Sequence, residues 1–182
     1  PLGQGFGMAV GMATAESMLR ASVSKLIDHF TYVVAGDGDF QEPVVLGAAS
    51  MAGHWGLSKL IVFYDSNNAQ ISGKVDRSDS TNYAQVFEGF GWHVQEIDGH
   101  NHEEIREALE KAQVVDRPSL IIGKTIMAMG SATMEGDYET HIAPLTKNHM
   151  KDYFLKHFGG WSDEVSKNKF FEVLQEGNVF LY

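Results

Sequence analysis

The sequence predicts an α/β domain with a doubly wound, mainly parallel sheet and helices on both faces. Short apolar runs that suit buried strands occur at residues 32–35, 60–64, 92–97 and 119–126. Runs that are apolar throughout indicate strands covered on both sides, as in parallel sheets. The segments between them predict helices at 42–54, at 83–90 and from a turn at 98–101 to about 114, with Asn101 as the cap of the last helix. The polar stretch at 66–82 predicts a loop at the carboxyl end of a strand. Strands that alternate with helices favour parallel pairing through right-handed crossovers.

Small residues form a ridge at the start of the chain. Gly3, Gly7, Gly11 and Ala15 recur every fourth residue and so share one face of an expected helix. Glycine inside a helix costs about 1 kcal/mol relative to alanine, so a close contact should compensate. The ridge is explained either by tight packing of this helix on the sheet or by a ligand or partner subunit pressed against the helix start.

Composition limits the class of protein. The 182 residues are 43% hydrophobic and 21% charged, which suits one ordinary globular domain. A net charge of −10 with scattered Lys and Arg argues against nucleic-acid binding. No run approaches the roughly 18 apolar residues of a membrane span, and no export signal is visible. The absence of cysteine excludes thiolate chemistry and fits a cytoplasmic protein.

Polar runs follow the first two expected strands directly. These runs are Gly36-Asp37-Gly38-Asp39 and Asp65-Ser66-Asn67-Asn68. Carboxyl ends of neighbouring parallel strands lie side by side, so the Asp37 carboxylate and the Asn67 amide oxygen should face each other. Mg²⁺ prefers such oxygen ligands together with phosphate and water, and the backbone carbonyl of Ala69 is the most plausible third protein ligand. The sequence therefore predicts a metal site that can hold a diphosphate.

The glycines of the first run suit the same interpretation. Gly36 and Gly38 leave room for phosphates to approach the backbone, and their amides can donate to phosphate oxygens. Taken alone, each run is more ordinarily a tight turn or a helix cap; their joint position at two strand ends favours the metal. The P-loop pattern is absent, and the glycines near residues 3–7 follow no strand, so a dinucleotide site is weakly supported.

Together with their flanks, these runs resemble transketolase, a thiamine-diphosphate enzyme. The resemblance extends from residue 1 to about residue 146, and its motifs occur in the transketolase order. They are Pro1-Leu2-Gly3-Gln4-Gly5, the Gly36-Asp37-Gly38 run, Val62-Phe63-Tyr64-Asp65-Ser66-Asn67, Phe90-Gly91-Trp92-His93-Val94, Asp98-Gly99-His100, Pro118-Ser119-Leu120-Ile121 with Lys124-Thr125, and His141-Ile142-Ala143-Pro144-Leu145.

The resemblance implies roles for particular residues. Asp37, Asn67 and the Ala69 carbonyl would hold Mg²⁺ or Ca²⁺ on the diphosphate of thiamine diphosphate. His141 would lie over the diphosphate and the thiazolium and assist proton transfer to the substrate. The further cofactor-binding residues implied are Leu2, Gly36, Gly38 and Glu42, the last near a dimer interface in a carboxylate network that links two cofactor sites.

The resemblance also implies a domain organisation. Residues 1–147 would be a diphosphate-binding domain without its N-terminal part, and 148–182 a linker or packing arm with a helix at 149–158 and another short helix after Gly159-Gly160. The chain starts without Met, as expected for a section of a longer protein. The pyrimidine-binding domain, whose Glu activates the cofactor, would belong to the full protein or to a separate chain.

The implied activity is transfer of a two-carbon ketol unit between sugar phosphates, in the pentose phosphate pathway, by a homodimer. This chain alone would be inactive without its partner domain. Two alternatives stay open: an inactive proteolytic or excised fragment, and a part of a related enzyme such as dihydroxyacetone synthase or 1-deoxy-xylulose-5-phosphate synthase.

The sequence departs from the family pattern at a few positions. Asp39 adds a negative charge beside the expected site, where the family usually has a small or apolar residue. The other departures are Pro43, Ser66, Ile142 and Thr146. None removes an expected metal ligand, but Asp39 and Ile142 put fine tuning of the site and substrate access in question.

Overall fold

The computed structural model describes residues 1–23, 26–71, 73–131, 133–142 and 146–158. The chain divides into two compact units, Pro1–Thr125 and Ile126–Tyr182. The first unit contains the sheet and both polar runs. Within the described residues, no helix is both long enough and apolar enough to cross a membrane.

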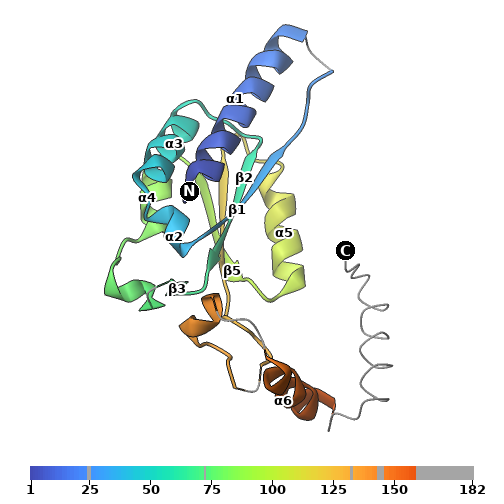
Figure 1. The fold of residues 1–182 in the computed structure, drawn as a ribbon. Coiled ribbons are helices and arrows are strands. Elements are labelled where there is room, and N and C mark those ends of the chain that lie inside the picture. Colours follow the sequence, from blue (N-terminus) through green and yellow to red (C-terminus); the bar gives the residue numbers. More distant parts are fainter. Residues whose placement is uncertain (24–25, 72, 132, 143–145, 159–182) are drawn as a thin grey trace. The chain divides into compact units, whose positions relative to one another are not determined.

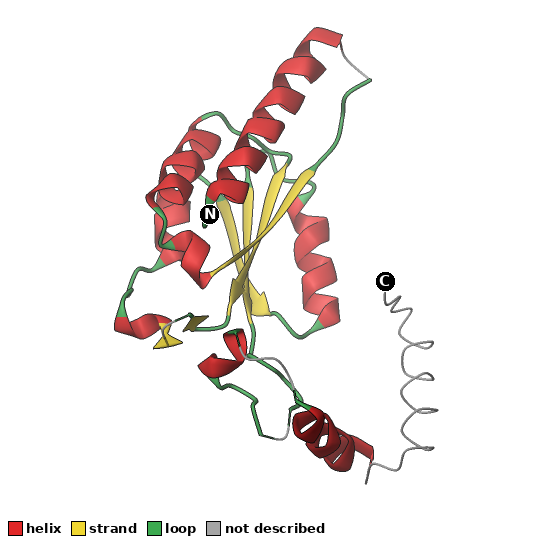
Figure 2. Ribbon diagram, viewed as in Figure 1, coloured by secondary structure: helices red, strands yellow, loops and turns green. Residues whose placement is uncertain are grey.

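Four parallel strands form the sheet of the first unit (Figures 1 and 2). Their order is β1 (Thr31–Gly36), β2 (Leu60–Ser66), β6 (Ser119–Lys124) and β5 (His93–Asp98). Each adjacent pair is parallel. The predicted parallel sheet is confirmed, and the predicted strands differ from the observed ones by no more than two residues at either end.

Helices cover both faces of this sheet, which confirms the doubly wound prediction. On one face lie α1 (Gln4–Val23), α3 (Pro43–His54) and α4 (Tyr83–Gly89), and on the other lies α5 (His102–Ala112) (Figure 1). Strand side chains alternate between the two faces, as the period of a strand requires. On β2, Leu60, Val62 and Tyr64 join the core under α1, α3 and α4, whereas Ile61 and Phe63 face α5.

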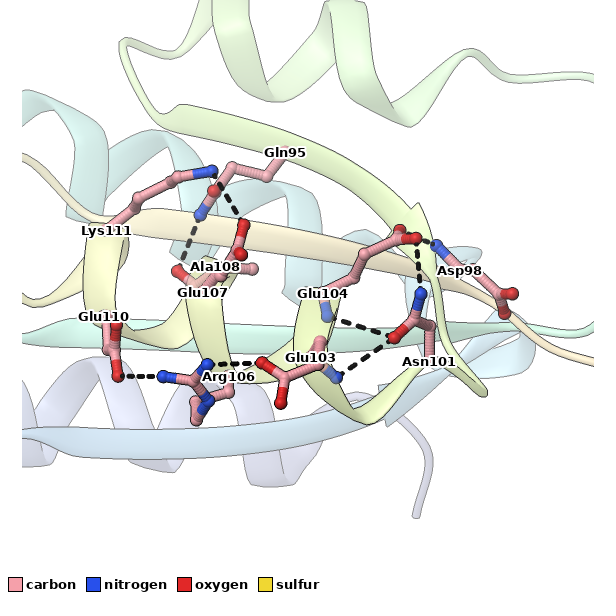
Figure 3. Close-up of polar contacts among 10 residues, drawn as sticks. All are labelled: Gln95, Asp98, Asn101, Glu103, Glu104, Arg106, Glu107, Ala108, Glu110 and Lys111. Carbon is pink, nitrogen blue, oxygen red and sulfur yellow. Dashed lines mark hydrogen bonds and ion pairs between the residues drawn. The ribbon is translucent and has the colours of Figure 1, made fainter.

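The start of α5 is capped as the sequence predicts. The side-chain oxygen of Asn101 accepts hydrogen bonds from the backbone N–H groups of Glu103 and Glu104, at 3.1 and 3.4 Å (Figure 3). The Glu104 carboxylate accepts from the side-chain amide of Asn101 at 2.8 Å and from the backbone N–H of Asp98 at 2.8 Å. These bonds satisfy N–H groups that a helix start leaves without intrahelical partners.

The small-residue ridge of α1 packs tightly only at its beginning. Gly3 precedes the helix with φ +72°, and a Cβ there would meet side-chain atoms of Glu42, Val44 and Val45 at 2.9 Å. Gly11 and Ala15 are exposed. The face of α1 toward the sheet is formed instead by Phe6, Ala9, Val10 and Ala13. The explanation by helix–sheet packing is therefore wrong: the ridge meets α3 at one end and solvent at the other.

Two local structures differ from the sequence-based expectation. The expected Gly-Asp-Gly turn is a one-turn helix, α2 (Asp37–Phe40), which Phe40 fixes by burying its ring completely. The expected loop at 66–82 contains a small antiparallel hairpin, β3 (Ala69–Gln70) with β4 (Gly73–Lys74), and a 3₁₀ turn, η1 (Val75–Arg77).

The described residues of the second unit form two regular elements. A 3₁₀ turn, η2 (Tyr138–His141), precedes α6 (Lys147–Phe158), which agrees with the helix expected at 149–158. The short helix expected after Gly159-Gly160 lies outside the described residues.

Candidate functional site

The two polar runs meet at the carboxyl edge of the sheet. Gly36, the last residue of β1, pairs in register with Asp65 of β2, so both chains leave the sheet at the same level. The Asn67 backbone N–H then donates to Asp37 Oδ2 at 3.1 Å. Carboxyl ends of strands are where open α/β sheets bind their ligands, and here the fold places a carboxylate beside an Asn at that edge.

Asp37 is a buried carboxylate with a donor on each oxygen. Its side chain is only 4% exposed, and burial of a charge is tolerated only where hydrogen bonds or ions compensate. The Tyr64 hydroxyl donates to Oδ1 at 2.6 Å, while Oδ2 accepts from Asn67. Each oxygen keeps further lone pairs, since a carboxylate offers about four acceptor sites. The carboxylate is therefore oriented and still able to bind a cation.

Tyr64 is itself held by aromatic neighbours. Its ring stacks on Phe40 of α2, with centroids 4.0 Å apart and planes 16° apart, and meets the edge of Tyr83 at 6.0 Å. Burial, reinforced by the hydrogen bond to Asp37, raises the pKa of the Tyr64 hydroxyl far above its ordinary value. The hydroxyl therefore stays protonated and donates to Asp37.

The Asn67 amide is oriented by its own loop. Its Oδ1 accepts from the Ala69 N–H at 2.9 Å, and its Nδ2 donates to Asp65 Oδ2 at 3.1 Å. The Thr125 hydroxyl in turn donates to Asp65 Oδ1. Asn68, which lies between Asn67 and Ala69, adopts a left-handed backbone with φ 58°, a conformation that Asn tolerates better than most residues. These bonds fix the oxygen of the Asn67 amide at the turn that begins beside Asp37.

These residues fit a hard divalent cation. The Asp37 carboxylate, the Asn67 amide oxygen and a backbone carbonyl are the oxygen donors that Mg²⁺ and Ca²⁺ prefer. Within the described part of the chain, no cluster of three or more His, Cys, Asp or Glu side chains is suited to a metal. This finding does not conflict with the set above, because that set contains only one such side chain, Asp37.

Asp39 does not add a free charge to the site. Its Oδ1 accepts from the Gly3 N–H at 2.8 Å and its Oδ2 from the Gly36 N–H at 3.0 Å. The carboxylate therefore caps α2 and ties the beginning of the chain to the turn after β1. The Leu2 side chain lies there too, since a Cβ on Gly38 would be 3.6 Å from Leu2 Cδ1. The negative charge expected at Asp39 is thus stabilised by two backbone donors, and its effect on the fine tuning of the site stays an expectation.

Glu42, His141 and Ala69 lie in three different settings. Glu42 is the N-cap residue of α3, half-buried against the start of the chain. Ala69 is buried in β3, two residues after Asn67. His141 is exposed at the end of η2, in the second compact unit, and residues 143–145 of its motif lie outside the described residues. Its role over the cofactor stays an expectation from the resemblance.

A polar cavity of about 390 Å³ opens at the same edge of the sheet. Asp37, Tyr64 and Ser66 line it, and so does Lys124 at the end of β6, whose Nζ donates to Ser66 Oγ at 3.2 Å. The other lining residues are Asn68, Val75, Asp79, Thr81, Asn82, Tyr83, Ala84, Glu96 and Ile122. Sequence reasoning gave no site role to Tyr64 or Lys124, although the position of Lys124 at a strand end was the available signal.

Asp79 and Tyr83 stabilise the loop that borders this cavity. The Tyr83 hydroxyl donates to Asp79 Oδ2 at 2.6 Å, and Thr81 donates to Oδ1 through both its N–H and its hydroxyl. Burial acts to raise the pKa of Asp79, but these hydrogen bonds outweigh it and hold the pKa below its ordinary value. Asp79 therefore remains a charged acceptor that fixes the loop.

The fold and the carboxyl-edge site together define a cofactor-binding α/β domain, in which an oriented carboxylate and an amide oxygen adjoin a polar cavity. Comparison with known proteins makes this more specific. The chain belongs to the family described as the transketolase, thiamine diphosphate binding domain, which matches residues 1–177. The resemblance to transketolase is thereby confirmed.

Individual relatives agree with this family. The chain is 44% identical over 156 residues to a transketolase of Halalkalibacterium halodurans, covering 83% of this chain and 23% of that protein. It is 47% identical over 146 residues to a transketolase of Sinorhizobium medicae, covering 80% and 21%. A crystal structure of transketolase from Campylobacter jejuni superposes with a TM-score of 0.82 at 37% identity, covering 98% of this chain and 29% of that one. The chain thus spans under a third of the length of these relatives.

Proposed function

We propose that this chain holds the diphosphate of thiamine diphosphate through a divalent cation, as the diphosphate-binding part of a transketolase. The observation that carries the proposal is the buried Asp37 carboxylate, which Tyr64 and Asn67 orient at the carboxyl edge of the sheet. A carboxylate oriented in this position is expected to bind a cation, and a cation can neutralise the diphosphate.

Each residue has a defined task in this proposal. Asp37, Asn67 and the Ala69 carbonyl hold Mg²⁺ or Ca²⁺. The further cofactor contacts come from Leu2, Gly36, Gly38, Glu42 and His141. At Gly36 the contact does not use the N–H group, because that group donates to Asp39. When bound, thiamine diphosphate supplies the electron sink for breaking and forming the carbon–carbon bond. The protein binds and orients the cofactor, and His141 assists proton transfer at the substrate oxygen.

The whole protein is proposed to transfer a two-carbon ketol unit between sugar phosphates, in the pentose phosphate pathway of the cytoplasm. Residues 1–147 are assigned to the diphosphate-binding domain and 148–182 to a linker or packing arm. A homodimer and a pyrimidine-binding domain, on the same protein or on a separate chain, complete the site. Exposed apolar side chains support such contacts: Met8 and Met12 on α1 are 70% and 57% exposed, and Val44 and Met51 on α3 are also exposed.

Calorimetric titration with thiamine diphosphate, with and without Mg²⁺, tests the binding proposal. We expect metal-dependent binding by the wild-type chain and its loss in Asp37→Ala. Asp116→Ala is the matched control, because it removes an exposed carboxylate in the loop after α5 and should bind as the wild type does. Metal-independent binding, or equal binding by Asp37→Ala and the wild type, would contradict the proposal.

Complementation tests the proposed activity. The chain is mixed with a chain that carries a pyrimidine-binding domain, and ketol transfer from sugar phosphates is measured with cofactor and Mg²⁺. We expect activity that depends on both chains. Failure with every such partner, despite intact cofactor binding, would favour an inactive fragment; activity with donors other than sugar-phosphate ketoses would favour a related thiamine-diphosphate enzyme.

A further inference from the structure

One buried hydroxyl at the edge of the sheet points directly at the candidate metal ligand. The Tyr64 hydroxyl lies 2.6 Å from Asp37 Oδ1, and both side chains are about 95% buried, with exposed fractions of 5% and 4%. A hydrogen bond from a hydroxyl to a charged carboxylate is among the strong ones in proteins. In a buried setting it also has little competition from water.

The ring of Tyr64 leaves its hydroxyl little freedom to move. Phe40 stacks on one side at 4.0 Å, and Phe40 belongs to α2, the same turn of helix that begins with Asp37. Tyr64 precedes Asp65, and Asp65 pairs with Gly36, the residue just before α2. The end of β2 is therefore held against α2 both by strand pairing and by the stack of Tyr64 on Phe40. The hydroxyl therefore meets the carboxylate from a fixed direction.

The opposite oxygen of Asp37 is held equally specifically. Asn67 donates its backbone N–H to Oδ2, and the Asn67 side chain is bonded to Asp65 and to the Ala69 N–H. A carboxylate with one donor on each oxygen cannot rotate about its Cβ–Cγ bond without breaking a bond. Its remaining lone pairs consequently point in a constant direction relative to Asn67.

We propose that Tyr64 is a positioning residue, which sets the orientation of the Asp37 carboxylate so that Asp37 and Asn67 present their oxygens to one cation. The identity of that cation rests on the proposed function. The orientation of Asp37 by Tyr64 does not depend on it. Tyr64 itself contacts neither metal nor cofactor in this account. It acts through Asp37, and residues that orient a metal ligand in this way typically change metal affinity by about 10- to 100-fold when they are altered.

Other tyrosines of the chain show why this role is specific to Tyr64. Tyr83 is also buried, but its hydroxyl donates to Asp79, an acid of the bordering loop. Tyr32 is 52% exposed on β1, and its hydroxyl accepts from Gln113 Nε2 at 2.7 Å. Tyr64 alone among these three donates to Asp37. Tyr32 therefore offers a matched control, in which the same hydroxyl is removed from a site away from the carboxyl edge.

Hydrogen exchange in the absence of ligand tests the positioning itself. Tyr64→Phe removes the hydroxyl and keeps the ring that stacks on Phe40, so we expect a folded protein. The backbone amide hydrogen of Asn67, which donates to Asp37, should exchange faster in this variant than in the wild type. Tyr32→Phe should leave that amide unchanged. Unchanged exchange at Asn67 in Tyr64→Phe would overturn the proposal, whatever the chain binds.

A double-variant comparison separates positioning from packing. In an Asp37→Ala background the hydroxyl has no carboxylate to orient, so adding Tyr64→Phe should change Asn67 exchange no further. If Tyr64→Phe instead accelerates exchange equally in both backgrounds, the hydroxyl acts on the Asn67 segment through a contact other than Asp37, and the proposal fails. Near-ultraviolet circular dichroism of each variant confirms that the aromatic cluster is intact.

Binding provides the second readout. In titrations with Mn²⁺ and thiamine diphosphate, Tyr64→Phe should bind about 10- to 100-fold more weakly than the wild type, and Tyr32→Phe should match the wild type. Equal affinity of Tyr64→Phe and the wild type would overturn the proposal. If the wild type binds no metal and cofactor, the proposed function fails instead, and the exchange experiments still decide whether Tyr64 positions Asp37.

Discussion

The two faces of the sheet are built from different kinds of side chain. The face under α1, α3 and α4 carries an aromatic cluster of Phe6, Phe40, Tyr64, Tyr83, Phe87 and Trp92. The face under α5 is smaller. Its buried centre is aliphatic, with Ile61, Ile121, Ala108 and Ala112, and Phe30 and Phe63 pack against it. We call them the aromatic face and the α5 face.

The faces also differ in how completely they are covered. On the aromatic face, α1 packs along β1, and the cluster continues to the carboxyl edge through Phe40 and Tyr64. On the α5 face, α5 packs on β5 and β6, and Tyr32 and Val34 of β1 are exposed at 52% and 77%. The candidate site is therefore anchored to the better-packed face. Stability and site geometry should depend on the aromatic face more than on the α5 face.

The largest expected effect comes from Phe40→Ala. Phe40 is fully buried and contacts four aromatic rings, so its truncation should lower the free energy of unfolding by about 3–5 kcal/mol. Denaturant titration measures this change. The paired control on the α5 face is Val34→Ala, which should change stability by less than about 0.5 kcal/mol because the side chain is exposed. Similar losses for both variants would remove the distinction between the faces.

A smaller effect is expected within the α5 face from Gly123→Ala. A Cβ at Gly123 would lie 2.9 Å from Phe63 Cε1 and closer still to Cζ, so the ring must move. Overpacking of this kind should destabilise the protein by about 1–3 kcal/mol, as read from thermal or urea unfolding. The double variant Gly123→Ala/Phe63→Leu should lose less than the sum of the two single variants. Strict additivity would show that the contact with Phe63 is not the cause.

The cap of α5 sharpens the comparison further. Asn101→Ala removes the oxygen that accepts from the Glu103 and Glu104 N–H groups, which should lower stability by about 1 kcal/mol. Backbone exchange should then increase first in α5, with α1 and α3 unaffected. Asn101→Asp is the control, since Asp retains an acceptor and caps helices comparably well. Loosening of the aromatic face as well would indicate that the two faces unfold as one.

The sequence allowed most of the architecture to be predicted, but only part of the site. Apolar runs at 60–64 and 119–126 predicted parallel strands because strands buried on both faces need few polar side chains. The meeting of Asp37 with Asn67 followed from the position of each at a strand end. These conclusions depended on local pattern and on the geometry of parallel sheets alone.

Three features could not be predicted because they depend on tertiary contacts. The run that begins at Gly36 reads as a turn, but burial of Phe40 and capping by Asp39 make it helical. The role of Tyr64 required the register between β1 and β2, since its hydroxyl crosses between strands. The small-residue ridge on α1 suggested packing of that face on the sheet. The side chains that α1 buries against the sheet lie on another face of the helix.

The smallest expected effect concerns pH. His93 lies on the α5 face near Ser119, and burial, followed by the charges of Arg117 and Lys111, lowers its pKa below the ordinary value of about 6.5. Below that value the unfolded chain binds a proton that the folded chain resists, so stability should be full above pH 6.5 and decline as the pH falls through it. Urea unfolding between pH 8 and pH 5.5 measures the slope. His93→Gln should flatten it; an unchanged slope would assign the dependence to other groups.

The bond between the Gly3 N–H and Asp39 has a consequence for the order of folding. It joins residues 36 positions apart, and contacts that are distant in sequence form only after the intervening loop has closed. The same carboxylate caps the turn that carries Asp37 and Gly38. The pairing of β2 with β6 joins Ile61 with Ser119 and closes a longer loop than the bond between Gly3 and Asp39 does. A nascent chain can therefore shape the corner that carries Asp37 before β6 completes the sheet.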